Sequence, residues 1–353
     1  MINIVILTVI LIIFVVLFNY YFFLFCSRFI FGKYIKNFIL SLTISILSLI
    51  IVDFYIFKFF GHGFPSSISE EIYERSPSPY DMFAGKPKYK DHNSYGFKGG
   101  NFIQANEKEI SIGFFGGSTG YNGDPPIINL IEKNFAKENI KINSYNFSSV
   151  SSNHNQHVHR LLKYSNLKFD FVIFYGGFNE TIQTYLYDPR PGYPFNFWIR
   201  NELSKLKYIL LKYSSIYAEY EKKTGKISDL DQIKKKINYG SEEWIQVLLM
   251  NYINVLEKAK VLSKKVVKSN KCKTTNFLAF YQPISNKNSD KTTKLIITKT
   301  KDILLKKKNL IYDISDILNE TYFIDSVHIS QKGRELIADE IYKYIFPLAK
   351  NCI

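Results

Sequence analysis

The stretch Ile110-Ser-Ile-Gly-Phe-Phe-Gly-Gly-Ser-Thr-Gly120 decides the fold of this chain. A short apolar run that ends in glycines is typical of a buried strand, and the glycines allow the backbone to turn sharply after it. The apolar spacing of residues 125–138 predicts a helix just beyond the turn. We therefore expect a strand followed by a helix, which is the repeating unit of an α/β fold.

The rest of the chain repeats this alternation. Residues 169–175 are apolar enough for a strand that is buried on both faces. Because parallel strands need a crossover connection, the alternation predicts a parallel five-stranded sheet covered by helices on both faces. The result is a three-layer α/β/α domain over residues 109–353, with a helical insertion at about 181–270. Further strands are expected at 140–147, 275–281 and 310–314, and helices at 153–164, 198–223, 242–268, 291–307 and 331–345.

The composition is that of a folded protein. The chain has 353 residues, of which 46% are hydrophobic and 3 are cysteines. These values exclude a disordered tail, a collagen-like fibre and a disulfide-stapled mini-protein. The net charge is +15, but no stretch interleaves basic and aromatic residues in a way that would indicate a nucleic-acid partner.

The first 60 residues predict a membrane anchor. Residues 1–27 carry no charged side chain, and residues 4–25 are almost all apolar. At about 1.5 Å per residue this run is long enough to cross a hydrocarbon core of about 30 Å. Asp53 is the one charged residue in a second apolar run, at 38–57. We expect two transmembrane helices, because the first run has neither the basic start nor the cleavage site of a signal peptide.

Basic residues set the expected orientation of this hairpin. Arg28, Lys33 and Lys36 lie between the two runs without an acidic residue, and short basic loops stay on the cytoplasmic side. The rest of the chain is then extracytoplasmic, on the periplasmic side of the cytoplasmic membrane. Residues 61–108 are rich in Gly, Ser, Pro and charge, so we expect a stalk or lead-in segment there.

Two of the three cysteines form a candidate pair. Cys26 lies at the end of the first apolar run, which leaves Cys272 and Cys352. In the predicted fold Cys272 precedes a strand, and Cys352 follows a closing helix that runs back to the same side of the sheet. A disulfide between them can persist outside the cytoplasm and would hold the C-terminus. Two cysteines by themselves leave the bond undecided.

Ser118 is the first candidate for a chemical role. It follows Gly116 and Gly117 at the strand-to-helix turn, where the amide groups of the next helix would face a charge that forms beside its oxygen. The same residues also suit a serine that caps a helix. A serine becomes a good nucleophile when a neighbouring base takes its proton, so the interpretation depends on a histidine.

Among the six histidines, His328 has the most suitable surroundings. It lies in Asp325-Ser-Val-His328, just before the last predicted helix. An acid and a histidine three residues apart can pair on a turn, so that the other ring nitrogen faces a serine. His154, His157 and His159 could suggest a metal site, but no Cys or acidic residue has supporting spacing. One face of an amphipathic helix explains this cluster better.

Polar residues also follow the strand at 169–175, in Gly-Gly-Phe-Asn179-Glu180. Ester hydrolysis passes through an oxyanion, and the Asn179 amide together with a backbone N–H could donate hydrogen bonds to it. A simple turn that contains asparagine would look the same. Functional residues of parallel sheets collect at the carboxyl ends of the strands, where Ser118 and His328 are also expected.

Three of these stretches together resemble the SGNH (GDSL-like) hydrolase superfamily. Gly-Gly-Ser118-Thr, Gly-Phe-Asn179-Glu and Asp325-Ser-Val-His328 correspond in order, spacing and strand context to its first, third and fifth blocks across residues 110–345. The resemblance implies a flavodoxin-like fold of SGNH type. It also implies that Ser118 is the nucleophile, His328 the general base and Asp325 its orienting acid. The Ser118 N–H and the Asn179 side chain would stabilise the oxyanion.

One departure concerns the second block of the superfamily. A glycine N–H completes the oxyanion hole there, whereas this chain has Asn146-Phe-Ser-Ser-Val-Ser151-Ser. Ser151 is the nearest counterpart, and its N–H can still donate if the turn tolerates a Cβ. Glu180 replaces the more common Asp after the asparagine, at a position that we expect to fix the loop rather than react.

The predicted insertion begins with an aromatic segment at residues 185–198. Aromatic faces stack on sugar rings, and arginine pairs with carboxylates or phosphates. Packing near the membrane or anchoring of the loop would explain the same composition. The residues expected to bind substrate are Tyr185, Tyr187, Arg190, Tyr193 and Trp198.

These features lead to one functional expectation and two alternatives. The expectation is a membrane-anchored, extracytoplasmic serine esterase that removes O-acetyl or related acyl groups from envelope or capsular glycans, without a metal or organic cofactor. The lead-in Asn93-Ser-Tyr-Gly-Phe-Lys-Gly99 resembles a segment of membrane-anchored members associated with envelope polysaccharide. One alternative is an O-acyltransferase that modifies the same glycans through the same acyl-serine. The other is a non-catalytic glycan-binding or polysaccharide-assembly protein. Lipid esters are a second substrate class.

Overall fold

The computed structural model of the protein describes most of the chain. It covers residues 32–60, 75–78, 81–182, 240–287, 291–307 and 309–353, and the single residues at 17, 20, 21, 214, 217, 220 and 238. The chain divides into two compact units, one of residues 1–69 and 198–227, the other of residues 70–197 and 228–353.

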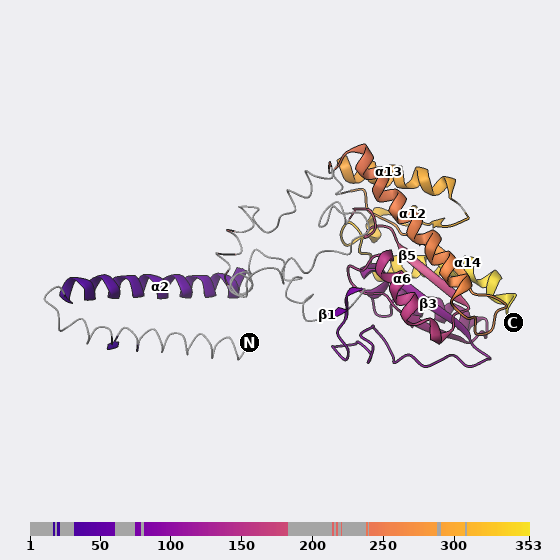
Figure 1. The fold of residues 1–353 in the computed structure, drawn as a ribbon, viewed down its shortest axis with the longest axis horizontal. Helices are drawn as coiled ribbons and strands as arrows, with labels where there is room; N and C mark the ends of the chain where they lie inside the picture. The colour runs from indigo at the N-terminus through magenta and orange to yellow at the C-terminus, as the bar shows by residue number, and fades with distance from the viewer. Residues whose placement is uncertain are drawn as a thin grey trace. The chain divides into compact units, whose positions relative to one another are not determined.

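The main described element of the first unit is a long helix. α2 (Gly32–Phe60) has 29 residues and contains the second apolar run (Figure 1). Large apolar side chains are exposed along it, among them Phe38, Leu49 and Ile51. Within the described residues, no helix combines the length and the apolarity needed to cross a membrane. The first run, 4–25, lies almost wholly outside the described residues, so the expected hairpin stays a prediction.

A five-stranded parallel sheet forms the centre of the second unit, as the sequence predicts. Its strands lie in the order β4-β3-β5-β6-β7, and each neighbouring pair is parallel. Every residue of β3 and β5 is buried, in agreement with the apolar runs in their sequences. The strands are β3 (Ile110–Gly116), β4 (Ile142–Asn146), β5 (Phe171–Gly176), β6 (Asn276–Tyr281) and β7 (Tyr312–Asp313).

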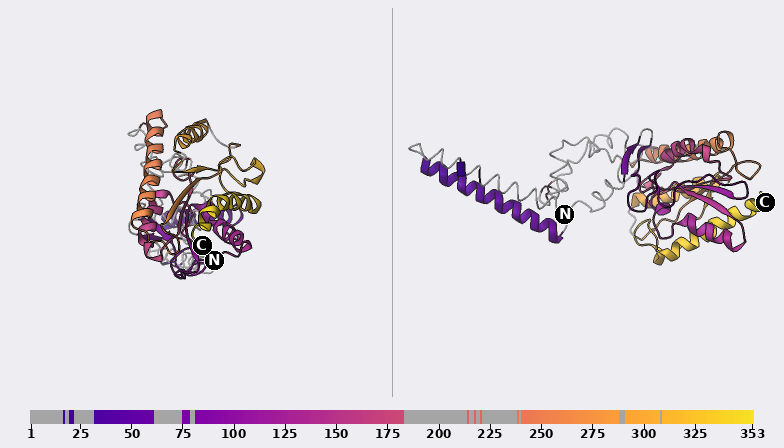
Figure 2. Two further views of the ribbon diagram at one scale, coloured as in Figure 1. Left: turned by 90° about the vertical axis from the view of Figure 1, so that its right-hand side faces the viewer. Right: turned by 90° about the horizontal axis from the view of Figure 1, so that it is seen from below.

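Helices cover both faces of the sheet (Figures 1 and 2). Adjacent side chains of a strand point to opposite faces, so Phe114 packs in one layer and Phe115 in the other. α6, α12 and α13 cover the Phe115 side, while α5 and α14 cover the Phe114 side. The helices are α5 (Ile127–Lys137), α6 (His154–Lys163), α12 (Glu242–Lys265), α13 (Lys291–Lys306) and α14 (Gln331–Lys350). The helix expected at 198–223 falls outside the described residues apart from isolated positions.

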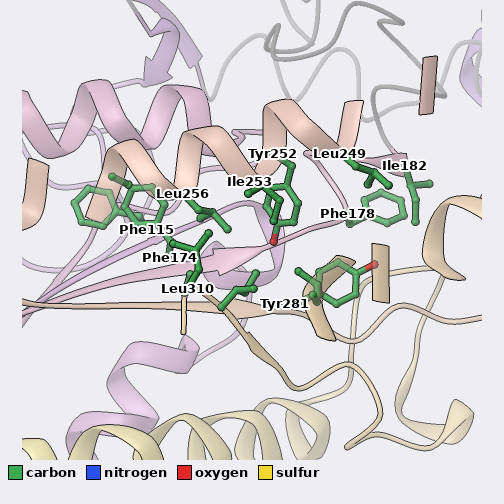
Figure 3. Packing of buried hydrophobic residues seen from close by; sticks show 14 of the residues in the cluster. Phe115, Phe174, Phe178, Ile182, Leu249, Tyr252, Ile253, Leu256, Tyr281 and Leu310 are labelled. Atoms are coloured by element: carbon green, nitrogen blue, oxygen red, sulfur yellow. The ribbon is translucent and has the colours of Figure 1, made fainter. Parts of the chain in front are cut away.

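The layer on the Phe115 side is rich in aromatic rings. Phe115 stacks on Phe147 with ring centroids 4.7 Å apart, and the Phe174 ring lies 5.2 Å from Phe115. Figure 3 shows Phe174 near Leu256 of α12, with Tyr252 one turn away on the same helix. Large, rigid side chains packed in this way hold the strands and the loops at their ends in fixed positions.

Part of the expected stalk or lead-in segment packs on the domain. β1 (Arg75–Ser78) and β2 (Met82–Gly85) pair antiparallel, and Phe97 is 2% exposed in the aromatic layer. The Asp81 carbonyl accepts a hydrogen bond from Gln156 Nε2 of α6 at 2.6 Å. Gly96 and Gly99, which have positive φ, therefore lie in bends of a packed structure, which the composition of the segment does not reveal.

Cys272 and Cys352 form a disulfide, with their Cα atoms 4.6 Å apart. Cys272 lies shortly before β6, and Cys352 follows α14. The candidate pair of the sequence analysis is thus present in the structure. The bond joins residues that are 80 positions apart and ties the C-terminus to the amino side of the sheet.

Replacing both cysteines should lower the stability of the protein. A cross-link over a loop of this length restricts the unfolded chain, so the Cys272→Ser, Cys352→Ser double variant should lose about 3–4 kcal/mol of the free energy of unfolding. Thermal melts of the full chain with and without a reducing agent measure the effect. The double variant is the control, because a reducing agent should not shift its melting temperature. Equal melting temperatures for oxidised and reduced wild-type protein would contradict the prediction.

Candidate active site

Ser118 lies where β3 turns into a short helix. β3 ends at Gly116, and α4 (Ser118–Tyr121) begins directly after Gly117. β3 has β4 on one side and β5 on the other, and such a switch point of a doubly wound sheet is where ligands bind in folds of this kind. Ser118 is 9% exposed, so its side chain is nearly enclosed by the surrounding loops.

His328 faces Ser118 from a distant part of the sequence. Its Nε2 atom lies 2.8 Å from Ser118 Oγ, although the two residues are 210 positions apart. His328 Nδ1 lies 2.6 Å from Asp325 Oδ2. Since Asp325 accepts the Nδ1 proton, Nε2 is the acceptor for the serine hydroxyl. The three side chains have the geometry of a Ser-His-Asp triad.

Local hydrogen bonds hold the Asp325 carboxylate. Its Oδ1 atom accepts from the backbone N–H groups of Val327 at 2.8 Å and of His328 at 2.7 Å. Partial burial raises the pKa of Asp325, but these N–H donors and the His328 ring outweigh it and hold the pKa below its usual value. Asp325 is therefore an anion at neutral pH and a permanent partner for the histidine ring.

Asn179 approaches the residue that precedes Ser118. It follows β5, and its Nδ2 atom donates to the Ser152 carbonyl at 2.7 Å. A Cβ atom on Gly117 would lie 2.3 Å from this nitrogen, so glycine is needed there. An amide nitrogen carries two hydrogens. One is donated to Ser152, and the other can serve an oxyanion beside Ser118.

Ser151 has the left-handed backbone conformation that favours glycine, with a φ of 60°. A side chain is thus accommodated where the superfamily resemblance leads one to expect glycine, at a cost of about 1 kcal/mol. The loop that carries Ser151 follows β4 and is attached to β3, because the Ser149 N–H donates to the Gly116 carbonyl at 3.1 Å. The turn therefore tolerates the Cβ of Ser151, which is the condition for its N–H to serve as a donor.

The structure does not describe the expected substrate-binding residues. All five lie in the segment outside the described residues, at Tyr185, Tyr187, Arg190, Tyr193 and Trp198. The expected nucleophile, base, acid and amide donor, by contrast, all lie at the carboxyl edge of the sheet.

A buried polar cluster lies next to the Asn179 turn, and the sequence analysis does not reveal it. His154 Nδ1 lies 3.0 Å from His157 Nδ1 and 3.0 Å from Glu180 Oε1. Burial lowers the pKa of His154 to about 3 and raises the pKa of Glu180 to about 7. Glu180 is 26 residues from His154, so the local spacing of the histidines gives no sign of this contact. His159 is exposed whereas His154 and His157 are buried, so the three histidines do not share one face of the helix.

In the part of the chain that the structure describes, this cluster also brings together side chains of the types that bind metal ions. The donor atoms of His154, His157 and Glu180 lie within 4.8 Å of one another. Hydrogen bonds already join the two rings and the carboxylate, so their geometry does not require an ion.

Comparisons with known proteins find similar solved structures, while no protein-family model and no curated protein matches the chain. A lipase from a goat rumen metagenome is 14% identical, covering 66% of this chain and 96% of its own, with a TM-score of 0.40. An acetylxylan esterase from Geobacillus stearothermophilus is 14% identical, covering 68% and 95%, with a TM-score of 0.38. A lipolytic G-D-S-L family member from Veillonella parvula is 10% identical, covering 66% and 97%, with a TM-score of 0.37. At TM-scores below 0.5, these likenesses carry no argument about function.

Asp325→Asn should strongly reduce turnover. Asparagine keeps the size of the side chain but no longer orients the His328 ring as a proton acceptor, so kcat for p-nitrophenyl acetate should fall by about 10³–10⁴-fold. Asp316→Asn is a matched control, since Asp316 is an exposed partner of Lys301, and its kcat should stay at the wild-type value. A kcat for Asp325→Asn within threefold of wild type would show that this carboxylate does not orient the base.

Gly117→Ala should weaken the oxyanion side of the site. The added Cβ would collide with Asn179 Nδ2, and the loss of one donor costs about 10²–10³-fold in kcat. Asn179→Ala should show a loss of the same size. Gly100→Ala is the control, because a Cβ there meets nothing within 4 Å. A wild-type kcat for Gly117→Ala would show that the close approach of Asn179 Nδ2 to Gly117 is not needed for turnover.

Proposed function

We propose that the protein is a serine esterase. The observation that carries the proposal is the pair of contacts at His328, with Nε2 2.8 Å from Ser118 Oγ and Nδ1 2.6 Å from Asp325 Oδ2. A hydroxyl, an imidazole and a carboxylate in this order activate a serine as a nucleophile. The Asn179 amide next to Gly117 supports the proposal, because acyl transfer also needs a donor for the oxyanion.

In the proposed reaction, His328 Nε2 takes the hydroxyl proton as Ser118 Oγ attacks the ester carbonyl. The N–H groups of Ser118 and Ser151 and the Asn179 side chain hold the tetrahedral oxyanion. The ester bond then breaks, and the alcohol leaves with the proton from His328. Water attacks the acyl-serine and gives a proton to His328, which returns it to Ser118 as the acid departs. These steps use side chains and backbone N–H groups of the protein together with water.

For the substrate we propose O-acetyl or related acyl groups on envelope or capsular glycans. The sequence supports this class through the aromatic and arginine residues of the 185–198 segment, which suit sugar rings. The resemblance of residues 93–99 to a segment of polysaccharide-associated members adds to it. Lipid esters are the competing class, because the N-terminal sequence predicts a site held near a bilayer.

We also propose that the site faces an extracytoplasmic space and is held at a membrane. The Cys272–Cys352 disulfide supports an oxidising compartment. The apolar runs at 4–25 and 38–57 support attachment, as do the exposed apolar side chains of α2, which water solvates poorly. The basic residues between the runs support a cytoplasmic loop.

Hydrolysis by the purified full chain tests the esterase. Acetate should be released from p-nitrophenyl acetate and from an O-acetylated polysaccharide, and Ser118→Ala should lower the rate by at least about 10³-fold. A fluorophosphonate should label the wild type and spare Ser118→Ala. Ser165→Ala, on the surface, should behave as wild type. If the wild type neither hydrolyses these esters nor reacts with the probe, the proposal fails.

Adding a deacetylated glycan as acceptor separates hydrolysis from acyl transfer, because both reactions share the acyl-serine. An esterase should still deliver the acyl group to water and release acetate. Recovery of the acyl group on the glycan would replace the esterase by an O-acyltransferase.

A further inference from the structure

Glu180 is a buried carboxylate directly after Asn179 that takes no part in the proposed reaction. It is 6% exposed. Its Oε2 atom accepts from the Gly177 N–H at 2.6 Å, and its Oε1 atom accepts from the His154 N–H at 2.8 Å. Burial raises the pKa of Glu180 to about 7, so above that pH the group is a carboxylate, with these N–H donors in place of water. Glu180 therefore ties the turn after β5 to the start of α6.

These two segments also meet at Asn179 itself. The turn after β5 carries Asn179, and Ser152 lies just before α6. Asn179 Nδ2 donates one hydrogen to the Ser152 carbonyl at 2.7 Å. The direction of the second hydrogen, which faces the oxyanion in the proposed reaction, thus depends on where the Ser152 carbonyl lies.

A side-chain relay leads from Ser152 back towards the carboxylate. Ser152 Oγ lies within hydrogen-bond distance of two carbonyl groups, at 2.8 and 3.1 Å, so its proton goes to one of them. Arg160 Nη1 donates to the same oxygen at 3.1 Å. The remaining lone pair accepts from His157 Nε2 at 2.9 Å. His157 therefore carries its proton on Nε2 and has Nδ1 as an acceptor.

His154 completes the relay. Burial lowers the pKa of His154 to about 3 and the pKa of His157 well below its usual value, so both rings are neutral. Because His157 Nδ1 is an acceptor, the proton between the two Nδ1 atoms belongs to His154. That N–H also lies 3.0 Å from Glu180 Oε1. The assignment leaves His154 Nε2 as a bare lone pair, in agreement with its lack of a hydrogen-bond partner among the described residues.

We propose that Glu180 is a positioning residue of the oxyanion hole. Through His154 and His157 it holds the Ser152 side chain by its Oγ atom, and the backbone carbonyl of the same residue aims the Asn179 amide at the Ser118 side. The proposal rests on the esterase function proposed above. Removing the carboxylate should leave substrate binding and the triad intact. It should misplace the Asn179 amide, which donates to the oxyanion in the transition state. We therefore expect kcat to fall while KM changes little.

Glu180→Gln tests the positioning role. Glutamine has the same size but presents an NH₂ group to one of the two backbone N–H donors, so kcat for p-nitrophenyl acetate should fall by about 10–100-fold while KM stays within about threefold. Glu132→Gln in α5 is the matched control, because Glu132 accepts from Ser144 Oγ at 2.8 Å, and it should keep both wild-type constants. A wild-type kcat for Glu180→Gln would overturn the proposal.

A double-mutant cycle separates positioning from a general loss of structure. If Glu180 acts through Asn179, then Glu180→Gln should lower kcat by less than about threefold in the Asn179→Ala background. If Glu180→Gln lowers kcat by the same factor in the Asn179→Ala background as in the wild type, the proposal is overturned. His154→Phe serves as the second variant if Glu180→Gln does not fold, because a phenyl ring can keep the packing on Phe174, 5.1 Å away. It should follow the same pattern.

Hydrogen exchange measured by mass spectrometry tests the contact without turnover. Peptides that cover residues 148–157 and 177–182 should exchange faster in Glu180→Gln than in the wild type or in Glu132→Gln. Unchanged exchange in both peptides would overturn the proposal. If wild type and Ser118→Ala hydrolyse esters equally slowly, the esterase proposal fails. The hydrogen-exchange comparison of Glu180→Gln with the wild type still decides whether Glu180 joins the two segments.

Metal analysis of the same samples distinguishes the relay from an ion held by the same side chains. The wild type should contain less than about a tenth of an equivalent of zinc after purification without chelator. One equivalent of bound metal in the wild type that is lost in Glu180→Gln would overturn the side-chain relay in favour of a metal site.

Discussion

Parallel pairing of β3 with β4 on one side and β5 on the other is the constraint on which the candidate site depends. The register places Gly116 opposite Tyr175, so β3 and β5 end together at one edge of the sheet. The loops that follow the three strands carry Ser118, Ser151 and Asn179. Because both faces of the sheet are covered by packed helices, these loops start from a rigid base.

The two sides of the site are held by different kinds of interaction. On the base side, the Asp325 turn is local, and the His328 side chain is 34% exposed, so the imidazole remains in reach of water and substrate. On the oxyanion side, a buried set of neutral histidines and one carboxylate joins two loops. Deep burial makes each unmade hydrogen bond costly, which favours one fixed arrangement of the amide donor.

Glycines at the ends of two strands allow this close packing. Gly117 leaves room for the Asn179 amide, since a Cβ would come within 2.3 Å of it. Gly177 has a φ of 130°, and a Cβ there would lie 2.4 Å from the Tyr281 ring. The Gly-Gly pairs after β3 and β5 thus let backbone and side chains approach more closely than any other residue permits.

The apolar runs and the glycines after them determined the five strands of the parallel sheet and the helices that cover it, because these depend on local burial patterns. The antiparallel pair of β1 and β2 was not predicted. The Asp325–His328 pair was also predictable, since three residues on one turn bring it together. Only the tertiary structure decided the 2.8 Å contact between Ser118 and His328, the burial of Phe97 and the bond between His154 and Glu180. Each of these contacts joins segments that are far apart in the chain. Such segments meet because whole layers pack together, and this packing leaves no periodic pattern in the sequence.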